Sequence, residues 1–438
     1  MLLNRVLGIL HKPMRVIYES SVILKCIDSA ILVSILLTFI LSSFLSSDVI
    51  GCLCLSTLIL TIVRIITNPE DSLKCEKFEL FLLAYFMISI ISVAGSTLLP
   101  LSLKGFSKTF LYLGFYFSVV HHLKNNRKNI FPILLCIASC ITFEAIIGLS
   151  QNFIQVGEIS GWQDTSRLNP EEVMTRVYGT LQPLNPNLLG GYFVAGITSV
   201  YGLFAYFLYQ KKYKIASLFL ICSLLDTLTI FLTGCRGAYI AIFLISTLIF
   251  IISLKFFWKT YKKVYFILLS FLSVFMTVIL LAVSSLRARI FSIFAMRSDS
   301  SNSFRFNVYQ AGIQMFKDNW PIGIGMGNQN FREIYGLYMK TGFDALSAYN
   351  IYLETAIESG IFALVAFLAF LFNLLFNACK YIYKSLNMQY VIFASIAFVS
   401  ICGVMVHGMV DTVFFRPQIQ VVFWTMVAIL SNCIYSKD

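Results

Sequence analysis

The chain has 438 residues, of which 58% are hydrophobic and 12% are charged, and its net charge is +12. Soluble domains carry about 25% charged residues, so this composition excludes a soluble enzyme, a disordered protein and a secreted disulfide scaffold. It is typical of an all-α polytopic membrane protein, whose spanning helices each need about 20 apolar residues. The positive charge fits the excess of Lys and Arg in cytoplasmic loops of membrane proteins. Nucleic-acid binding is not indicated, because no segment has the composition of a water-exposed basic domain.

Apolar runs of suitable length predict twelve transmembrane helices. They cover residues 27–45, 49–66, 78–99, 104–121, 130–154, 188–209, 214–233, 237–255, 264–285, 358–377, 389–409 and 417–435. Every second connection between them is rich in Lys and Arg, which predicts that both termini lie in the cytoplasm. In this division, residues 1–26 form a cytoplasmic or interfacial segment. The first five spans occupy 27–154, the next four occupy 188–285, and the last three with the C-terminus occupy 358–438.

Two long connections, 155–187 and 286–357, are predicted outside the membrane on the opposite side from the termini. Connections of this length are usually functional or disordered. The second contains Trp320, Phe331 and Tyr335, and this aromatic composition predicts a large helical extracytoplasmic lid loop. We expect a helix from about residue 304 to 318, a Gly-rich turn at 323–327, and a second helical stretch that reaches about residue 340.

Two arginines on the outer side are candidate anion ligands. Arg236 lies in a tight link between two apolar spans, where a charge is costly unless it is paired or faces a polar cavity. Arg305 lies on the same predicted side of the membrane. Since guanidinium groups bind phosphate oxygens bidentately and stay charged, the two would suit a diphosphate. The alternative is that Arg236 is an ordinary interfacial arginine that snorkels to the surface.

Candidate bases cluster near the tenth and eleventh spans. Asn350, Glu354 and Glu358 are spaced i, i+4, i+8 on a helix expected to begin near residue 347, so they share a face. The two carboxylates are candidate bases or sugar ligands; a solvated helix face is the alternative. His407 and Asp411 form a further i, i+4 pair, in which the carboxylate would orient the imidazole and raise its basicity. A structural role is the alternative here too.

The eleven cysteines indicate no metal centre, because the sequence has no C-x-x-C and no Cys/His cluster with zinc spacing. We therefore expect no bound metal. The Gly-rich stretch at 323–328 is not the dinucleotide fingerprint, and we expect no cofactor.

Several segments between residues 176 and 411 resemble the O-antigen ligase and polymerase superfamily. They are 176–181 (RVYGTL), 185–192 (NPNLLGGY), 234–238 (GCRGA), Arg305 with the helix after it, 321–328 (PIGIGMGN), 349–360 (YNIYLETAIESG) and 407–411 (HGMVD). The resemblance covers about 130–425, with the motifs in the family's order. It implies a helical fold like that of the C-type membrane glycosyltransferases. By position, Arg236 and Arg305 match the family's pyrophosphate arginines, and Arg176, Asn187, Tyr349, Asn350 and Asp411 fall in motifs that imply substrate binding.

The resemblance implies transfer of a glycan from an undecaprenyl-diphosphate carrier to an acceptor hydroxyl. The reaction would take place on the outer side of the bacterial inner membrane, without nucleotide sugar or metal. The expected partners are membrane lipids, the lipid-linked glycan, and a glycan or lipid-linked acceptor.

The sequence departs from the family at Tyr349, which takes the place of the family's histidine. Tyrosine, with a pKa near 10, is a poor base at neutral pH, so Glu354, Glu358 or His407 is expected to serve instead, unless a base is only weakly required. Five segments are similar in sequence to the cyanobacterial IctB-like branch, named for a proposed role in inorganic-carbon accumulation. They are 162–164, 169–172, 179–187, 298–305 and 344–349. The alternative function is therefore transport of bicarbonate or another small anion, and a third is glycan binding without catalysis.

Overall fold

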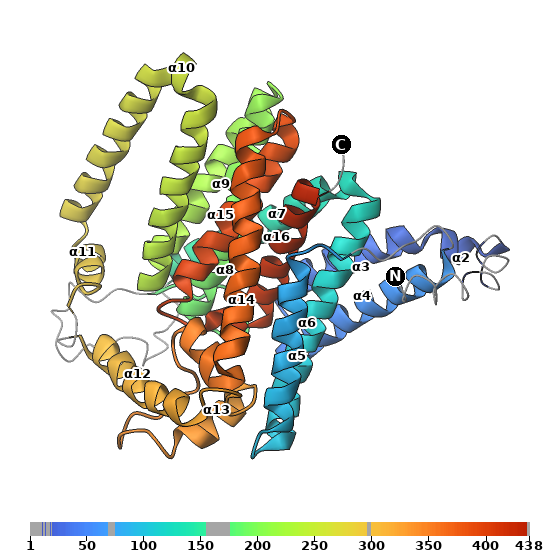
Figure 1. Cartoon of the computed structure of the whole chain (residues 1–438). Coiled ribbons are helices and arrows are strands. Elements are labelled where there is room, and N and C mark those ends of the chain that lie inside the picture. Colours follow the sequence, from blue (N-terminus) through green and yellow to red (C-terminus); the bar gives the residue numbers. More distant parts are fainter. Residues whose placement is uncertain are drawn as a thin grey trace.

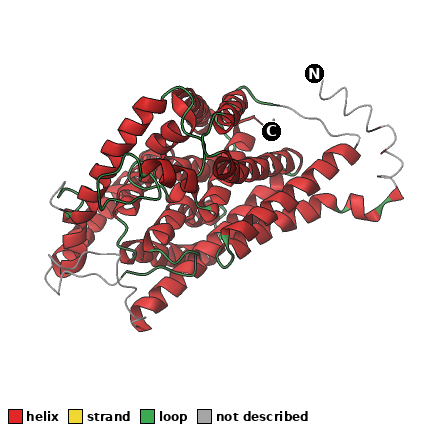
Figure 2. Cartoon of the chain, turned by 90° about the horizontal axis from the view of Figure 1, so that it is seen from below, coloured by secondary structure: helices red, strands yellow, loops and turns green. Residues whose placement is uncertain are grey.

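The structure, a computed structural model, describes residues 20–68, 75–154, 176–295 and 299–435, together with residues 11, 14 and 18. Every element in these ranges is a helix joined by loops or turns, without a strand (Figure 2). The N-terminal segment expected at 1–26 and the loop expected at 155–187 fall largely outside the described residues.

The helices fall into three groups along the chain. The first group is α2 (Val22–Lys25), α3 (Ile27–Ser42), α4 (Ser47–Thr67), α5 (Glu79–Ala94), α6 (Leu99–Asn125), η1 (Arg127–Asn129) and α7 (Ile130–Ile154). The second is α8 (Pro186–Tyr209), α9 (Tyr213–Leu232), α10 (Arg236–Ala282) and α11 (Ser284–Phe291). The third is α12 (Ser300–Asn319), α13 (Asn328–Tyr335), α14 (Ile351–Lys384), α15 (Met388–His407), η4 (Val413–Phe415) and α16 (Pro417–Tyr435).

Eight helices in the described part of the chain are long and apolar enough to cross a membrane. They are 47–67, 127–152, 186–209, 213–232, 236–256, 351–384, 388–407 and 417–435. The chain is therefore an all-helical, multi-pass membrane protein, as the composition predicts. The expected count of twelve is not confirmed. The helices α3 and α5 are apolar but shorter, at 16 residues each, and α6, which carries Lys104 and Lys108, is not among the eight.

The predicted spans at 237–255 and 264–285 belong to one element, α10. Figure 1 shows this helix running away from α12 and α13, turning at the far end of the molecule and coming back. Lys255 lies in its middle, and its ammonium group donates to the main-chain carbonyl of Ile382, at 2.8 Å, and to that of Tyr383. Ile382 and Tyr383 lie in the last turn of α14, so the C-terminus of α14 lies next to the turn of α10.

The core of the bundle is built around α16. Every residue of this helix from Pro417 to Cys433 is buried, and it packs against α6 on one side and α15 on another. Next to them, α8 packs against α9 and α15, and α5 packs against α14. A helix that is apolar on all faces is buried by its neighbours, which explains why the polar face of a surface helix is missing from α16.

Residues 299–350, called the α12–α13 segment below, form a second core of their own. Val308, Met315, Phe331 and Tyr335 are buried together, and Ile357 of α14 joins them. Figure 1 places α12 and α13 at one end of the bundle, at the bottom of the view. The expected helix at 304–318 corresponds to α12, whose N-cap is Asp299, with its carboxylate accepting from the amide of Asn302. The second expected stretch is shorter, because α13 ends at Tyr335.

Candidate functional site

The site is organised by a break in α14. Gly360 has φ 80° and ψ 174° and interrupts the helical hydrogen bonding. The carbonyl groups of Ile357 and Glu358 accept instead from the amides of Ile324 and Gly325, both at 2.9 Å. Helix carbonyls that lose their partners must be satisfied by another group. The Gly-rich stretch predicted as a plain turn therefore fills the gap in a broken helix.

Two glycine contacts let this stretch approach the neighbouring backbones. A Cβ at Gly323, which has φ 81°, would lie 2.5 Å from the carbonyl of Glu358. On the other side, a Cβ at Gly105 of α6 would lie 2.5 Å from the Cα of Gly327. The stretch is thus held between α14 and α6, and Ser102 of α6 accepts from the amide of Met326 at 2.9 Å. Backbone contact of this kind fixes the distance between the two helices.

A cavity of about 330 Å³ lies between α6, α14 and the start of α16. We call it the central cavity. Its polar lining residues are Ser47, Lys108, Thr109, Tyr112, Asn185, Asn187, Asn328, Ser347, Tyr349, Glu354, Thr355, Glu358, Asp411, Thr412, Arg416 and Gln420. Rings of Tyr85, Phe367, Phe414, Phe415 and Trp424 complete the walls. An aromatic lining with a few convergent polar groups is typical of small-molecule sites.

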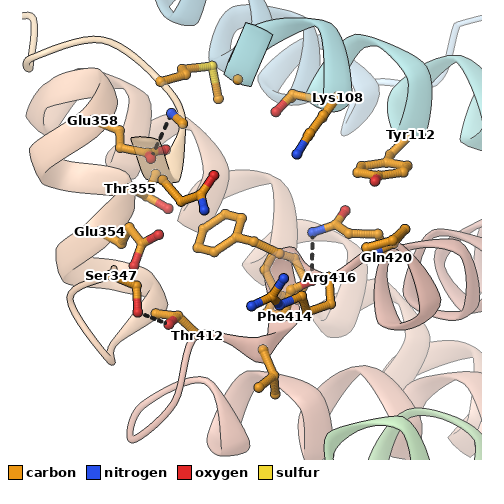
Figure 3. Close-up of a pocket in the computed structure, with 18 of the residues that line it drawn as sticks. Lys108, Tyr112, Ser347, Glu354, Thr355, Glu358, Thr412, Phe414, Arg416 and Gln420 are labelled. Atoms are coloured by element: carbon orange, nitrogen blue, oxygen red, sulfur yellow. Dashed lines mark hydrogen bonds between the residues drawn. The ribbon is translucent and has the colours of Figure 1, made fainter. Parts of the chain in front are cut away.

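Two carboxylates of α14 face this cavity (Figure 3). Glu354 and Glu358 are 3% and 5% exposed and lie one turn apart. One oxygen of Glu358 accepts from the amide of Gly327 at 2.8 Å, and one oxygen of Glu354 accepts from the amide of Ala348 at 2.9 Å. The second oxygen of each has no recorded hydrogen bond within the described ranges. Each carboxylate is therefore held at one oxygen and open to the cavity at the other.

Asn350 was expected on the same face, but it has a different position. Helix α14 begins at Ile351, four residues later than expected, and Asn350 is its N-cap. Its side-chain oxygen accepts from the amides of Tyr352 and Leu353, each at 3.0 Å, and its NH2 group donates to the carbonyl of Met409. A capping side chain satisfies the free amides of the first turn. Asn350 thus positions the carboxylates and does not line the cavity.

Tyr349 lines the cavity in a left-handed backbone conformation, with φ 51°. The guanidinium carbon of Arg305 lies 5.6 Å from the centre of its ring, and the ring of Phe304 meets it edge-on at 5.9 Å. Burial, and then the charge of Asp411, raise the pKa of the Tyr349 phenol above its ordinary value, with Arg305 acting in the opposite direction. Tyr349 is therefore neutral and placed to offer a ring face or a hydroxyl.

Four arginines lie close to one another beside the cavity. One precedes α8, one begins α10, one lies in α11 and one lies near the start of α12. We call Arg176, Arg236, Arg289 and Arg305 the arginine cluster. Arg236 pairs with Asp299 at 3.0 Å and donates to the carbonyl of Ser292, and Arg305 lies 3.7 Å from a carboxylate oxygen of Asp411.

The other two arginines of the cluster bind neutral oxygens. Arg176 donates to the side-chain oxygen of Asn187 at 2.6 Å and to the carbonyl of Thr233. Arg289 donates to the carbonyl of Gly234 at 2.8 Å. Burial, followed by the charges of Arg176 and Arg236, lowers the pKa of Arg289 to about 10. The cluster is therefore a concentration of positive charge that suits an anion.

The cluster reaches the cavity indirectly. Asn187 and Asp411 line the central cavity, and they are the groups that Arg176 and Arg305 contact. Arg236 and Arg305 do not line it themselves. Instead, Arg236 connects the start of α10 to Asp299 at the start of α12.

His407 is placed away from the cavity. It is 3% exposed, and its Nε2 lies 3.6 Å from the sulfur of Cys235. The carboxylate of Asp411 accepts from the amides of Thr412 and Val413, at 2.7 and 3.2 Å. The expected hydrogen bond between His407 and Asp411 is not among the bonds of the described residues. Of the three candidate bases, Glu354 and Glu358 therefore have the better access to a substrate.

Lys108 and Arg416 are cavity residues that the sequence analysis did not select. A signal was present for Lys108, since a charge inside an apolar helix usually faces a polar cavity or a partner. Arg416 gave no comparable signal, because it was predicted in an ordinary connection between two spans. Only the fold places it beside α6 and α14.

Comparison with known proteins supports the family resemblance. Residues 218–368 match a family model, Wzy_C, described as O-Antigen ligase. The match supports the superfamily assignment. It runs from α9 into α14 and so includes Arg236, Arg289, Arg305, Tyr349 and the two glutamates. No curated protein matches the chain.

Proposed function

We propose that the chain is a membrane glycosyltransferase of the O-antigen ligase and polymerase type. Its donor is a glycan on an undecaprenyl-diphosphate carrier, and its acceptor is a hydroxyl of a glycan or lipid-linked sugar. The observation that carries the proposal is the carboxylate pair Glu354 and Glu358, open to the central cavity within the segment that matches the O-antigen ligase model. The resemblance to the IctB-like branch is a similarity of short sequence segments, and we propose the same glycosyltransferase function for a chain that carries them.

The reaction needs a base and a site for the leaving group. The acceptor oxygen attacks the anomeric carbon, and the bond from that carbon to the diphosphate oxygen breaks with its electron pair going to the diphosphate. The proton of the acceptor hydroxyl passes to the carboxylate pair, which is general-base catalysis. Positive groups fixed in advance near the leaving group stabilise its developing charge.

The arginine cluster is the proposed leaving-group site. Among the described residues, the Arg236 guanidinium makes its hydrogen bonds through Nη1, which leaves Nη2 and Nε for phosphate oxygens. Arg305 is the second phosphate ligand, and the ring of Tyr349 beside it is the proposed sugar contact. Arg176 acts by positioning Asn187 at the cavity wall. His407, packed against Cys235, positions the start of α10.

The proposed location is the bacterial inner membrane. The α12–α13 segment and the arginine cluster would then face the outer side, where a lipid-linked glycan is presented. The alternative of bicarbonate or small-anion transport uses the same arginines, and the experiment below distinguishes it.

The test is glycan transfer by purified protein in lipid bilayers, with an undecaprenyl-diphosphate-linked oligosaccharide as donor. Glu354→Gln and Glu358→Gln keep the size of the side chain and remove the base. At least one of them should reduce the rate by roughly 10²- to 10⁴-fold, the range for general acid–base groups. Glu333→Gln is the matched control, because Glu333 is exposed on α13, and it should transfer at the wild-type rate.

Two results would contradict the proposal. One is that both glutamine variants transfer as fast as the wild type. The other is that the wild type transfers none of the lipid-linked donors, while vesicles containing it accumulate labelled bicarbonate in a way that Arg236→Gln abolishes. The second result would replace glycan transfer with anion transport.

A further inference from the structure

Two cations of the central cavity form no ion pair with a carboxylate of the described residues, although the charge of Arg416 acts on Glu354 from a longer distance. Lys108 extends from α6, and Arg416 lies between η4 and α16 (Figure 3). Within the described ranges, neither side chain makes an ion pair or a hydrogen bond. Both are only partly exposed. A charge held in such a place is costly unless a partner or a ligand offsets it.

The surroundings of these cations are rigid and suited to a sugar. Gln420 donates to the carbonyl of Phe414 at 3.0 Å and accepts from the indole of Trp424 at 2.6 Å. These bonds fix the indole of Trp424 on the cavity wall, which the ring of Tyr112 also lines. Figure 3 shows Tyr112 and Gln420 on the side of the cavity opposite Glu354 and Glu358, with Lys108 near Tyr112 and Arg416 between the two sides.

The donor diphosphate does not account for this second positive group. The diphosphate is already assigned to Arg236 and Arg305 of the arginine cluster. The cluster contacts the cavity-lining residues Asn187, Asp411 and Tyr349 and comes from the region of α8, α10 and α12. Lys108 and Arg416 instead come from α6 and from the residue before α16. One donor brings one diphosphate. Two separate cationic groups around one cavity therefore indicate a second anionic group on the substrates.

We propose that Lys108 and Arg416 form a subsite for the negatively charged group of an acidic sugar, such as the carboxylate of a uronic acid. The inference rests on the proposed function, because it takes a glycan as the occupant of the cavity. Arg416 would bind the carboxylate with two parallel hydrogen bonds, and Lys108 would bind as a point charge. The acidic sugar belongs to the donor or to the acceptor, and the two arms of the test distinguish these sources.

The test compares matched glycans that differ only in charge. One contains a hexuronate, and the other is the same glycan with the carboxyl group reduced to a hydroxymethyl group. In one arm the uronate is on the lipid-linked donor, and in the other it is on the acceptor. In one of the arms the wild type should show a higher kcat/KM for the acidic glycan. Lys108→Gln and Arg416→Gln should each reduce the ratio of acidic to neutral kcat/KM roughly ten- to hundredfold, as expected for loss of a hydrogen bond to a charged group.

Lys104→Gln is the matched control. Lys104 lies one turn earlier on α6, is exposed and does not line the cavity, so its loss should leave the ratio at the wild-type value. The preference should also weaken with salt in the wild type, because charge interactions in an open cavity are screened.

Three outcomes would overturn the inference. They are a wild type without preference in either arm, an unchanged ratio in both variants, and an equal fall for acidic and neutral glycans. The last would mean that Lys108 and Arg416 hold the diphosphate, which both donors share. Binding of the free uronate oligosaccharide and its reduced form is measured in parallel. If the wild type transfers nothing but binds the acidic form more tightly through Lys108 and Arg416, the proposed function fails and the subsite stands.

Discussion

Tyr349 shows how one residue has a place in the site without acting as a base. Its positive φ of 51° is uncommon for a residue with a bulky side chain. The conformation is held from several directions, since Tyr309 donates to its carbonyl at 3.2 Å and Asn350 starts α14 directly after it. Strained positions persist where the surroundings determine them, and they cluster at functional sites. The ring is thereby fixed between Arg305 and the cavity.

Replacing Tyr349 separates the ring from the hydroxyl. Tyr349→Phe keeps the ring and should lower glycan transfer by no more than roughly tenfold, since a neutral hydrogen bond contributes about 1 kcal/mol. Tyr349→Ala should lower it further, because Arg305 and Phe304 lose the ring that they contact. The measurement is kcat/KM for the lipid-linked donor in bilayers.

The pH profile provides the control for Tyr349. Its pKa is raised above the ordinary value of about 10, so the phenol stays protonated from acidic to mildly alkaline pH. Wild type and Tyr349→Phe should therefore have the same profile from acidic to mildly alkaline pH. A limb that is present in the wild type and missing in Tyr349→Phe would mean that the phenol titrates during catalysis.

The break in α14 determines the geometry of the site at the level of the elements. The amide of Ile361, on the far side of the break, donates to the carbonyl of Trp320 at 2.9 Å, and the amides of Ile324 and Gly325 bond on the near side. Glu358 lies two residues before the break, and its carboxylate receives the amide of Gly327. Position and orientation of the glutamate therefore both depend on the 321–327 stretch.

Gly360→Ala tests this dependence. Its φ of 80° disfavours any side chain, and a Cβ there would lie 2.4 Å from the carbonyl oxygen of Pro321. Backbone strain alone costs about 1–3 kcal/mol, and the close contact adds to it. We expect a lower thermal unfolding temperature in detergent and lost transfer.

Gly342→Ala is the matched control for that substitution. Gly342 has a similar φ of 87°, but a Cβ there would meet no atom within 4 Å. It should therefore cost only the backbone strain. Equal destabilisation by the two substitutions would show that the packing of the 321–327 stretch against α14 has no energetic importance.

The sequence predicts the helices better than the contacts between them. Apolar periodicity and length identify α8, α9, α15 and α16 to within a few residues, because burial in a membrane requires a long apolar run. The sequence also predicts that Glu354 and Glu358 share a face of one helix, because this follows from their spacing of four residues alone. The break at Gly360 was not predicted, because the hydrogen bonds that compensate it come from residues 320–325.

Long-range contacts explain the other differences. Arg416 and Lys108 are about 300 residues apart, and only the packing of α6 against α16 brings them to one cavity. His407 was paired with Asp411 on the basis of local spacing, but Cys235 is 172 residues away and bonds to its imidazole. Spacing along one helix carries no information about such partners.

At the scale of the whole molecule, several lysines of the helix connections lie at the end opposite α12 and α13. Helix α8 begins at Pro186 beside the cavity and ends at Tyr209, so Lys211, Lys212 and Lys214 follow at its far end. Lys384 ends α14, where Lys255 of α10 donates to the last carbonyls. Cations near the C-terminus of a helix interact favourably with its dipole. Cytoplasmic connections are rich in Lys and Arg, so this end is predicted to face the cytoplasm.

Cysteine labelling tests this orientation. The eleven natural cysteines are first replaced, and single cysteines are then introduced as Ser300→Cys at the start of α12 and Lys212→Cys between α8 and α9, both at exposed positions. An impermeant maleimide should label position 300 in intact cells, because the α12–α13 segment is predicted outside. It should label position 212 only after permeabilisation, which also serves as the control for reagent access. Labelling of both from the same side would contradict the odd number of crossings between them. Labelling of position 212 alone in intact cells would reverse the orientation and place the carboxylate pair and the arginine cluster on the cytoplasmic side, where an outward-facing glycan transfer is impossible.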